Sequence, residues 1–454
     1  MATLFGTDGV RGVANRDLTP ELVYRLGRAA ALQLGSGVNR PRILVGRDTR
    51  ISGDLLEAAL VSGILSAGAD VIAVGVVSTP GIAFLTRHLN AAGGAVISAS
   101  HNPVEDNGLK LFSRSGHKLT VDAEATVSDL ALKERDDLPR PTGAGVGRLR
   151  PAPALVEQYL DYLVRSTPVR LEGIRIVVDA GNGATYRLAP ELLERLGARV
   201  ILLNADPDGL NINVGCGSTH PAGLMKAVRE TGAVAGIAYD GDGDRAIAAD
   251  EHGREVDGDQ ILAVCGLHLL DQDRLPGRAI VGTVMTNLGL EVALRSAGGR
   301  VIRTPVGDRH ILEAMVREEL VLGGEQSGHI IFLDAATTGD GLLTTLRLLA
   351  VMVESGWPLS RLAARMVKYP QILVNVPARP AGSLESNAGL TRLVQAARGR
   401  LGPNGRVVLR PSGTEPVVRV MAEGEDSELV ETVAREIAAY IAREFGGPGA
   451  QEGG

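Results

Sequence analysis

One order of segments occurs three times along the chain: a buried strand, a turn, an apolar-periodic helix, a glycine and a second strand. The copies are expected at 42–46 and 70–75, at 174–179, 188–196 and 199–203, and at 279–284, 288–295 and 300–304. Two strands joined through a helix run parallel, and a parallel sheet needs helices on both faces. The sequence therefore predicts three related α/β domains with mixed, largely parallel sheets.

Breaks in this pattern mark the expected domain boundaries. A Pro/Gly-rich stretch at 138–145 suits a linker, and further breaks fall near 250–253 and 369–370. Beyond the third break, two strands and a helix with Leu429, Val433, Ile437 and Ile441 on one face indicate an α+β domain. We expect domains at 1–150, 151–252, 253–368 and 369–446, and a disordered tail at 447–454.

Composition excludes several classes of function. A formal net charge of -6 provides no basic surface for a polyanion, and 3% aromatic residues argue against stacking platforms for nucleic acid. The chain has no apolar run long enough for a membrane span, and its first residues lack the pattern of a signal peptide. Cys216 and Cys265 cannot form a disulfide framework, which fits a reducing compartment. We expect a cytoplasmic protein without membrane or nucleic-acid partners.

Three aspartates separated only by glycines, Asp240, Asp242 and Asp244, form the clearest candidate metal site. In an extended loop, alternate side chains share one side, so these carboxylates can converge on a hard cation. With Glu251 the spacing also matches an EF-hand, but Arg245 replaces its required glycine and the flanks are strand-like. A carboxylate set without histidine favours Mg²⁺, which commonly bridges carboxylates to a phosphate oxygen. A polar turn without metal is the remaining interpretation.

A second candidate segment, Gly94–Pro103, is predicted to be a buried strand that ends in a polar loop containing Ser100. Ligands of α/β sheets bind beyond the carboxyl ends of strands, and the absence of a G-x-S-x-G elbow disfavours acyl chemistry. By itself this Ser-His-Asn-Pro sequence is also typical of a plain turn. A further turn is expected at 106–108, before Lys110, one of only five lysines. That lysine is either an acid/base group or phosphate ligand, or a solvated surface residue.

Two loops in the second half of the chain carry groups suited to polar ligands. The loop at 323–329 can present Glu325 and Ser327 to sugar hydroxyls, although an ordinary strand-to-helix turn has the same composition. The segment at 410–419 is more specific, because arginines, hydroxyls and a glycine turn together form an anion-binding concavity. The groups that predict a phosphate site there are Arg410, Ser412, Gly413, Thr414 and Arg419.

Taken together, these segments resemble the α-D-phosphohexomutases. The motifs Ser98–Pro103, Asp240–Arg245, Gly324–His329 and Arg410–Pro416 occur in that family's order and approximate spacing, without a departure at any motif position. Phe5–Gly12 and the Glu-Gln-Ser-Gly-His form of the third motif are most similar to the bacterial members that act on glucosamine phosphates. Members that act on mannose and glucose phosphates usually carry Met-Ser-Ala at positions 326–328.

The resemblance implies four domains around a central cleft, each contributing one motif. Ser100 would be the phosphoserine, and one Mg²⁺ per subunit would be held by Asp240, Asp242, Asp244 and a phosphoserine oxygen. Glu325 and Ser327 would contact the sugar. The non-transferring phosphate would lie among Arg410, Ser412, Gly413, Thr414 and Arg419. Arg245 and Lys110 would neutralise charge in a loose transition state, and either Lys110 or His101 would be the general acid/base.

The implied reaction converts glucosamine 6-phosphate to glucosamine 1-phosphate, toward UDP-N-acetylglucosamine and the cell wall. Glucosamine 1,6-bisphosphate would be both intermediate and activator, and it would turn end for end between the two transfers. Three alternatives stay open: a mutase that prefers mannose or glucose phosphates, a Mg²⁺-dependent phosphatase and a non-catalytic phosphosugar sensor. A phosphatase needs no second phosphate site, and a sensor would tolerate loss of Ser100. The oligomeric state also stays open, a homodimer included.

Overall fold

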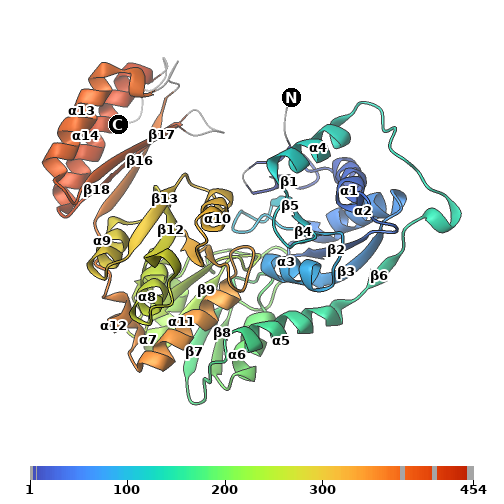
Figure 1. Ribbon diagram of the computed structural model, residues 1–454, viewed down its shortest axis with the longest axis horizontal. Helices are drawn as coiled ribbons and strands as arrows, with labels where there is room; N and C mark the ends of the chain where they lie inside the picture. The colour runs from blue at the N-terminus through green and yellow to red at the C-terminus, as the bar shows by residue number, and fades with distance from the viewer. Residues whose placement is uncertain (1–3, 7, 379–383, 412–416, 447–454) are drawn as a thin grey trace. The chain divides into compact units, whose positions relative to one another are not determined.

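The computed structural model describes residues 4–6, 8–378, 384–411 and 417–446. The chain divides into two compact units, one made of Met1–Thr283 with Ile302–Arg365 and the other of Val284–Val301 with Met366–Gly454. Four sheets with their helices make up these units (Figure 1). Three α/β segments and a C-terminal α+β segment follow one another along the chain, which confirms the predicted fold class.

The first sheet has six strands in the order β1-β5-β4-β2-β3-β6. These are β1 Val10–Val13, β2 Arg42–Arg47, β3 Asp70–Val76, β4 Gly93–Ile97, β5 Asp106–Ser113 and β6 Leu149–Pro151. The pairs β2/β3, β2/β4 and β3/β6 are parallel, whereas β5 is antiparallel to both β4 and β1. The turn predicted at 106–108 is wrong. Those residues begin β5, because pairing with β1 satisfies their backbone groups better than a local turn does.

Four helices accompany this sheet: α1 Pro20–Gly35, α2 Ser52–Ser66, α3 Thr79–His88 and α4 Val121–Leu132. The first begins at Pro20 because the Thr19 side chain caps the backbone N–H of Leu22. Glycine lets α1 and α2 approach closely, since a Cβ on Gly63 would lie 2.1 Å from the carbonyl oxygen of Tyr24. Close backbone packing in this domain therefore accounts for some of the 58 glycines of the chain.

The second sheet has the order β11-β10-β9-β7-β8. Its strands are β7 Arg175–Asp179, β8 Arg199–Leu203, β9 Ala235–Tyr239, β10 Ala246–Asp250 and β11 Glu255–Val256, and its helices are α5 Val156–Ser166, α6 Leu188–Arg195 and α7 Ala222–Thr231. Strand β7 pairs in parallel with β8, as the second strand–helix–strand copy predicted, and it also pairs in parallel with β9. Strands β9 and β10 are antiparallel and enclose residues 240–245. The aspartate motif is therefore a hairpin loop.

The third sheet has the order β13-β12-β14-β15. Its strands are β12 Ala279–Thr283, β13 Arg300–Thr304, β14 Leu322–Gly324 and β15 Ile330–Phe332; the helices of this region are α8 Gly258–Asp271, α9 Leu288–Ser296, α10 Asp308–Arg317, α11 Gly341–Ser355 and α12 Leu359–Ala363. Strands β14 and β15 are antiparallel and enclose residues 325–329. The strand-to-helix alternative for the third motif is therefore wrong, because strands lie on both sides of it.

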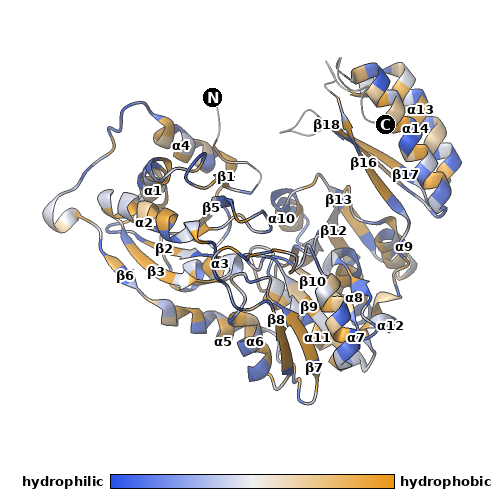
Figure 2. Ribbon diagram, turned by 180° about the vertical axis from the view of Figure 1, so that it is seen from behind, coloured by the Kyte–Doolittle hydropathy of each residue, from blue (hydrophilic) through white to orange (hydrophobic). Residues whose placement is uncertain are grey.

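The C-terminal sheet has three antiparallel strands in the order β16-β18-β17. They are β16 Gln371–Pro377, β17 Arg406–Pro411 and β18 Val417–Glu423, and the helices that follow β16 and β18 are α13 Ala388–Leu401 and α14 Ser427–Phe445. In Figure 2, α14 alternates between polar and apolar residues along its length. Val433, Ile437 and Ile441 are buried as predicted, but Leu429 is only half-buried and Val430 takes its place in the core.

The remaining features of the chain are minor. Short 3₁₀ turns occur at Gly143–Gly145, Pro153–Leu155, Pro276–Arg278 and Leu384–Ser386. Among the described residues, no helix is both long and apolar enough to cross a bilayer. Cys216 and Cys265 are both buried and free. The tail predicted at 447–454 lies outside the described residues.

Candidate active site

Ser100 lies in the loop that follows the central parallel strand β4, where its side chain is fully buried. Its φ of 54° is in the left-handed region, which costs a residue other than glycine on the order of 1–3 kcal/mol unless its surroundings hold it there. The hydroxyl donates a hydrogen bond to Asp240 Oδ2 at 2.5 Å, and His101 Nδ1 lies 3.2 Å from Ser100 Oγ. The loop therefore aims Ser100 at the aspartate motif, and it is more than a plain turn.

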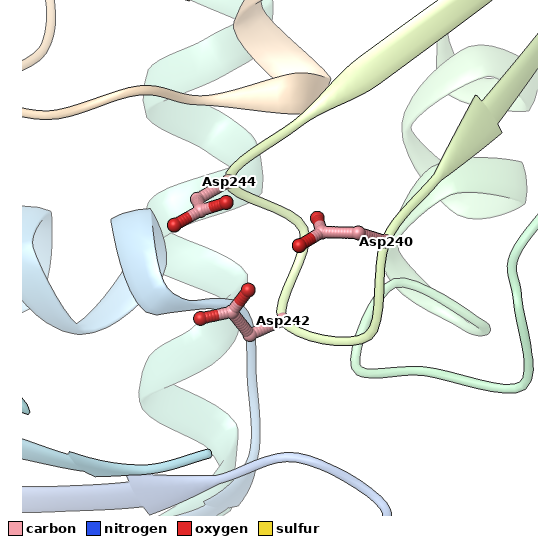
Figure 3. A group of neighbouring side chains, drawn as sticks. All are labelled: Asp240, Asp242 and Asp244. Carbon is pink, nitrogen blue, oxygen red and sulfur yellow. The ribbon is translucent and has the colours of Figure 1, made fainter. Parts of the chain in front are cut away.

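The three aspartates of the hairpin loop converge, as Figure 3 shows. One carboxylate oxygen of each residue lies within 4.8 Å of the others, and Asp240, Asp242 and Asp244 are all buried. The carboxylates converge as predicted, although the residues between β9 and β10 form a turn and not an extended loop. The EF-hand alternative is wrong, because its helices are replaced by these two strands.

The aspartate cluster fits a hard divalent cation. Within the described chain, Asp242 Oδ1 is buried without a hydrogen-bond partner, a costly arrangement unless another charge compensates for it. Asp244 Oδ1 also lacks a hydrogen bond, and its cationic neighbours are His329 at 3.6 Å and Arg245 at 3.8 Å. Burial and the neighbouring carboxylates of Asp244 and Asp242 raise the pKa of Asp240 well above its usual range. A cation on the three side chains would relieve this repulsion, and carboxylate oxygens are the ligands that Mg²⁺ prefers.

Lys110 is a buried member of the site. It lies in the middle of β5, and its ammonium group is 2.8 Å from Asp242 Oδ2 and 3.1 Å from Asp244 Oδ2. Although burial opposes the charge, Asp242, Asp244 and Asp8 together hold the pKa of this lysine well above its usual range. Of the two interpretations of Lys110, the solvated surface residue is therefore wrong. As a permanent cation, it suits charge neutralisation better than proton abstraction.

His101 has the opposite electrostatic environment. Burial, together with the positive charges of Arg245 and Arg11, lowers the pKa of its imidazole to about 4. The ring is therefore neutral near pH 7 and can accept a proton. Its Nδ1 lies within reach of the Ser100 hydroxyl. Of the two acid/base candidates, His101 has the protonation state of a base and Lys110 that of an acid.

A second ionic cluster adjoins the aspartates, and sequence reasoning missed it. Lys118 donates hydrogen bonds to Asp8 and Asp308, two residues of the first unit that are far apart in the sequence. His329 Nδ1 lies 3.6 Å from Asp244 Oδ1, and these acids raise its pKa although burial opposes the charge. The scarcity of lysine that drew attention to Lys110 would also have pointed to Lys118. No local pattern marked Asp308.

The third motif lies beside the aspartate loop. The backbone N–H of Ala246 donates to the carbonyl oxygen of Gly328 at 3.1 Å, and a Cβ on Gly328 would lie 2.2 Å from the Ala246 oxygen. Glu325 Oε1 accepts a hydrogen bond from the backbone of Gly307 at 3.2 Å. Ser327 Oγ is buried without a partner among the residues the structure describes. As whole residues, Glu325 and Ser327 are half-buried.

The fourth motif belongs to the second compact unit. Arg410 and Arg419 are directly opposite in the β17/β18 pair, and both are half-buried. Like charges at directly opposite positions of an antiparallel pair repel each other, so the two arginines suit an anion held between them. Ser412, Gly413 and Thr414 lie outside the described residues.

Comparisons with protein families cover nearly the whole chain. Models of phosphoglucomutase/phosphomannomutase alpha/beta/alpha domains I, II and III match residues 2–137, 157–253 and 257–369. The C-terminal domain model of the same family matches residues 373–440. All four models match in the order in which that family arranges them.

Relatives with known names are similar over their full length. A phosphoglucosamine mutase from Desulforudis audaxviator is 53% identical over 97% of this chain and 98% of its own, and one from Heliobacterium modesticaldum is 51% identical over 98% and 100%. A phosphoglucomutase/phosphomannomutase family protein from Burkholderia thailandensis superposes with a TM-score of 0.81 at 25% identity, over 99% of both chains. An Aspergillus fumigatus N-acetylphosphoglucosamine mutase, solved with GlcNAc-6P and magnesium, shares the fold with a TM-score of 0.70 at 20% identity, over 97% and 95%.

Proposed function

The chain belongs to the phosphoglucomutase/phosphomannomutase family, and from this premise we propose that it interconverts glucosamine 6-phosphate and glucosamine 1-phosphate. The observation that carries the proposal is the hydrogen bond from Ser100 Oγ to Asp240 at 2.5 Å. It joins the buried hydroxyl of a residue with a strained backbone to a carboxylate cluster. Relatives that are 53% and 51% identical in sequence and are named phosphoglucosamine mutase support the amino sugar as substrate.

Asp240, Asp242 and Asp244 would hold one Mg²⁺ per subunit, together with an oxygen of phosphorylated Ser100. When bound, the cation neutralises negative charge on the phosphoryl group. The magnesium in the Aspergillus enzyme supports this assignment. Lys110 adds a fixed positive charge on the same carboxylates, and Arg245 adds a second beside them.

In the first transfer, the bond between Ser100 Oγ and phosphorus breaks while a bond forms between O1 of glucosamine 6-phosphate and the same phosphorus. The proton lost from O1 ends on Ser100 Oγ. His101 can carry that proton, because it is neutral and its Nδ1 lies 3.2 Å from Oγ. Lys110 stays protonated throughout, in keeping with its three acidic neighbours.

In the second transfer, glucosamine 1,6-bisphosphate has turned end for end, and Ser100 recovers a phosphoryl group from O6. Both orientations of the sugar must bind at the same site. We therefore expect the protein to make only a few contacts with the sugar, and each contact should accept either orientation. Glu325 and Ser327 would supply the sugar contacts. The non-transferring phosphate would lie between Arg410 and Arg419, and the hydroxyls of Ser412 and Thr414 complete the proposed set.

The remaining assignments follow from the same premise. The domains would be 1–150, 151–252, 253–368 and 369–446, the location cytoplasmic, and the assembly a monomer or a homodimer. The phosphatase alternative is disfavoured by the facing arginines, because hydrolysis of one phosphate needs no site for a second. The sensor alternative leaves the strained and buried Ser100 unexplained.

The proposal is tested by incubating purified protein with glucosamine 6-phosphate, Mg²⁺ and a trace of glucosamine 1,6-bisphosphate. We expect glucosamine 1-phosphate to form with a higher kcat/KM than glucose 1-phosphate or mannose 1-phosphate does from the corresponding 6-phosphates. Release of inorganic phosphate instead would support a phosphatase. A higher kcat/KM with a mannose or glucose phosphate would move the chain to the other branch of its family.

Substitutions in the third and fourth motifs are expected to separate sugar discrimination from phosphate binding. Glu325→Ala should change the ratio of kcat/KM between glucosamine 6-phosphate and glucose 6-phosphate, because a carboxylate forms an ion pair with the 2-ammonium group but a weaker hydrogen bond with a hydroxyl. Arg419→Ala should lower kcat/KM for both sugars by a similar factor. Losing one charged phosphate contact costs about 2–4 kcal/mol, or roughly 30- to 1000-fold.

Steady-state kinetics of each variant on both sugars decides between these roles. Glu325→Gln keeps the size of the side chain but loses its charge, so it should shift the same ratio. Arg400→Ala removes a half-exposed arginine of α13 that pairs with Glu436, and it should change neither sugar's kcat/KM. Equal losses on both sugars for Glu325→Ala, or a sugar-dependent loss for Arg419→Ala, would show that the two motifs have been assigned to the wrong groups.

A further inference from the structure

Arg50, between β2 and α2, is a fully buried side chain that no step of the proposed reaction uses. Its guanidinium group faces the Ser100 loop, where it donates to the backbone carbonyl oxygens of Ser100 at 2.9 Å and Asn102 at 2.8 Å. It also donates to the carbonyl oxygen of Pro103. Three carbonyl groups of one short loop therefore converge on a single arginine from another part of the chain.

Asp48 connects the same arginine to the other side of Ser100. Its carboxylate accepts from Arg50 Nε at 3.0 Å and from Ser98 Oγ at 2.6 Å, and Ser98 Oγ in turn accepts from the backbone N–H of Ser100 at 2.9 Å. The hydrogen bonds thus form a closed ring from the Ser100 amide through Ser98, Asp48 and Arg50 to the Ser100 carbonyl. The ring therefore fixes both the backbone N–H and the backbone carbonyl group of Ser100 by hydrogen bonds.

This ring encloses the residue whose backbone is in the left-handed region, with a φ of 54°. Such a conformation persists in a residue other than glycine only where the surroundings over-determine it. A buried ion pair is by itself weak evidence of stabilisation, because desolvation of the two charges offsets their attraction. The pair of Asp48 and Arg50 is better explained by the backbone conformation that it imposes.

The second domain holds the loop from the opposite side. Asn213 Nδ2 donates to the Ser100 carbonyl oxygen at 2.9 Å, so this oxygen accepts two side-chain hydrogen bonds. The direction of Oγ is set by the backbone at Ser100, and Oγ points to Asp240. A shift of the carbonyl would therefore turn the hydroxyl away from the aspartate cluster.

We propose that Arg50, oriented by Asp48, is a positioning residue that fixes the left-handed backbone of Ser100 and so aligns Oγ for phosphoryl transfer; this inference rests on the proposed function. In the contacts that the structure describes, Arg50 touches neither the Ser100 hydroxyl nor the aspartate cluster at 240–244, so it acts through the loop backbone. Lysine at this position would keep one charge but could not reach three carbonyl groups and Asp48 at once.

The test compares Arg50→Lys with Arg28→Lys. Arg28 is an equally buried arginine of the same domain, which pairs with Asp136 and donates to the carbonyl oxygen of Leu138 at 2.9 Å, remote from Ser100 in the hydrogen-bond network. Each protein is prepared with phosphorylated Ser100, and the phosphorylated fraction is counted by intact mass. Single-turnover transfer to glucosamine 6-phosphate then gives a rate constant per phosphorylated enzyme, and calorimetry gives the stoichiometry of substrate binding.

Arg50→Lys is expected to bind one substrate per chain and to transfer its phosphoryl group on the order of 100-fold more slowly, because a displacement of about 1 Å can cost that much. Arg28→Lys should lose thermal stability but keep the wild-type rate constant. A rate constant for Arg50→Lys within threefold of wild type overturns the proposal. So does an equal slowing in Arg28→Lys, which would indicate a general loss of domain stability.

Two further variants keep the proposal falsifiable if Arg50→Lys does not fold. Ser98→Ala opens the ring without stranding a buried charge, and it should slow transfer in the same direction; an unchanged rate constant overturns the proposal. Arg50→Ala should regain part of its rate with 20 mM guanidinium and none with methylammonium. A wild-type protein that is inactive on every hexose phosphate would overturn the proposed function itself. An active wild type whose ring variants keep its rate constant would overturn only the positioning role.

Discussion

Alanine in place of Ser100 is expected to abolish isomerisation, with a loss on the order of 10⁴-fold or more in kcat, because the hydroxyl carries the transferred group. Substrate binding should survive, since the sugar and the non-transferring phosphate are held by other motifs. The fold should survive as well, because alanine can keep the backbone contacts that the neighbouring residues make with this loop. Intact mass should show one phosphate on part of the wild-type population and none on the variant.

Ser115→Ala is the matched control, since it removes an exposed hydroxyl from the same domain. It should leave both the phosphate and the rate unchanged. Peptide mapping identifies the phosphorylated residue directly. Phosphate on Ser98, whose hydroxyl already donates to Asp48, would contradict the assignment of Ser100.

The substitution Asp242→Asn is expected to remove nearly all Mg²⁺-dependent activity, with a loss on the order of 10³-fold, because it neutralises one of the three converging carboxylates. The fold should be retained. Asn can still accept from Thr79 Oγ1, which lies 2.6 Å from the Asp242 carboxylate, and the substitution relieves repulsion by Asp240 and Asp244. Initial rates against Mg²⁺ concentration, Mg²⁺ titration by calorimetry and circular dichroism separate loss of the metal from loss of structure.

Asp273→Asn provides the control for that substitution. Its side chain is 92% exposed, so the same change of charge there should leave Mg²⁺ binding and activity at wild-type levels. Wild-type protein that keeps full activity in excess chelator would contradict the metal role. Tight Mg²⁺ binding by Asp242→Asn would show instead that the cation is held elsewhere.

The repeated strand–helix–strand order could be predicted from sequence because it depends on local periodicity. Strands β7 and β8 carry continuous apolar residues, and the helix between them has its own period, so each element is encoded within a few residues. The turn at 106–108 failed for the opposite reason. Its Asp-Asn-Gly sequence favours a turn locally, but pairing with β1, almost a hundred residues earlier, makes it a strand.

The candidate site divides along the same line. Asp240, Asp242 and Asp244 lie within one short loop, so their spacing alone predicted that their carboxylates converge, and they do so in a turn. Ser98 belongs to the same motif as Ser100, but Asp48 lies 50 residues before Ser98, and no local pattern connects Asp48 and Arg50 to this loop. Their hydrogen-bond ring exists only because β2 and β4 are neighbours in the sheet.

The sequence by itself therefore determined the order of the three α/β segments and the C-terminal α+β segment, and it predicted the chemistry of each motif and Ser100 as the reacting serine. Only the tertiary structure decided protonation and strain. Acidic side chains from distant segments raise the pKa of Lys110 although burial opposes its charge, whereas burial and the charges of Arg245 and Arg11 lower the pKa of His101. Ser100 is held in a left-handed conformation by side chains that the fold brings to it. Such properties depend on distances through space, which a linear pattern of residues does not contain.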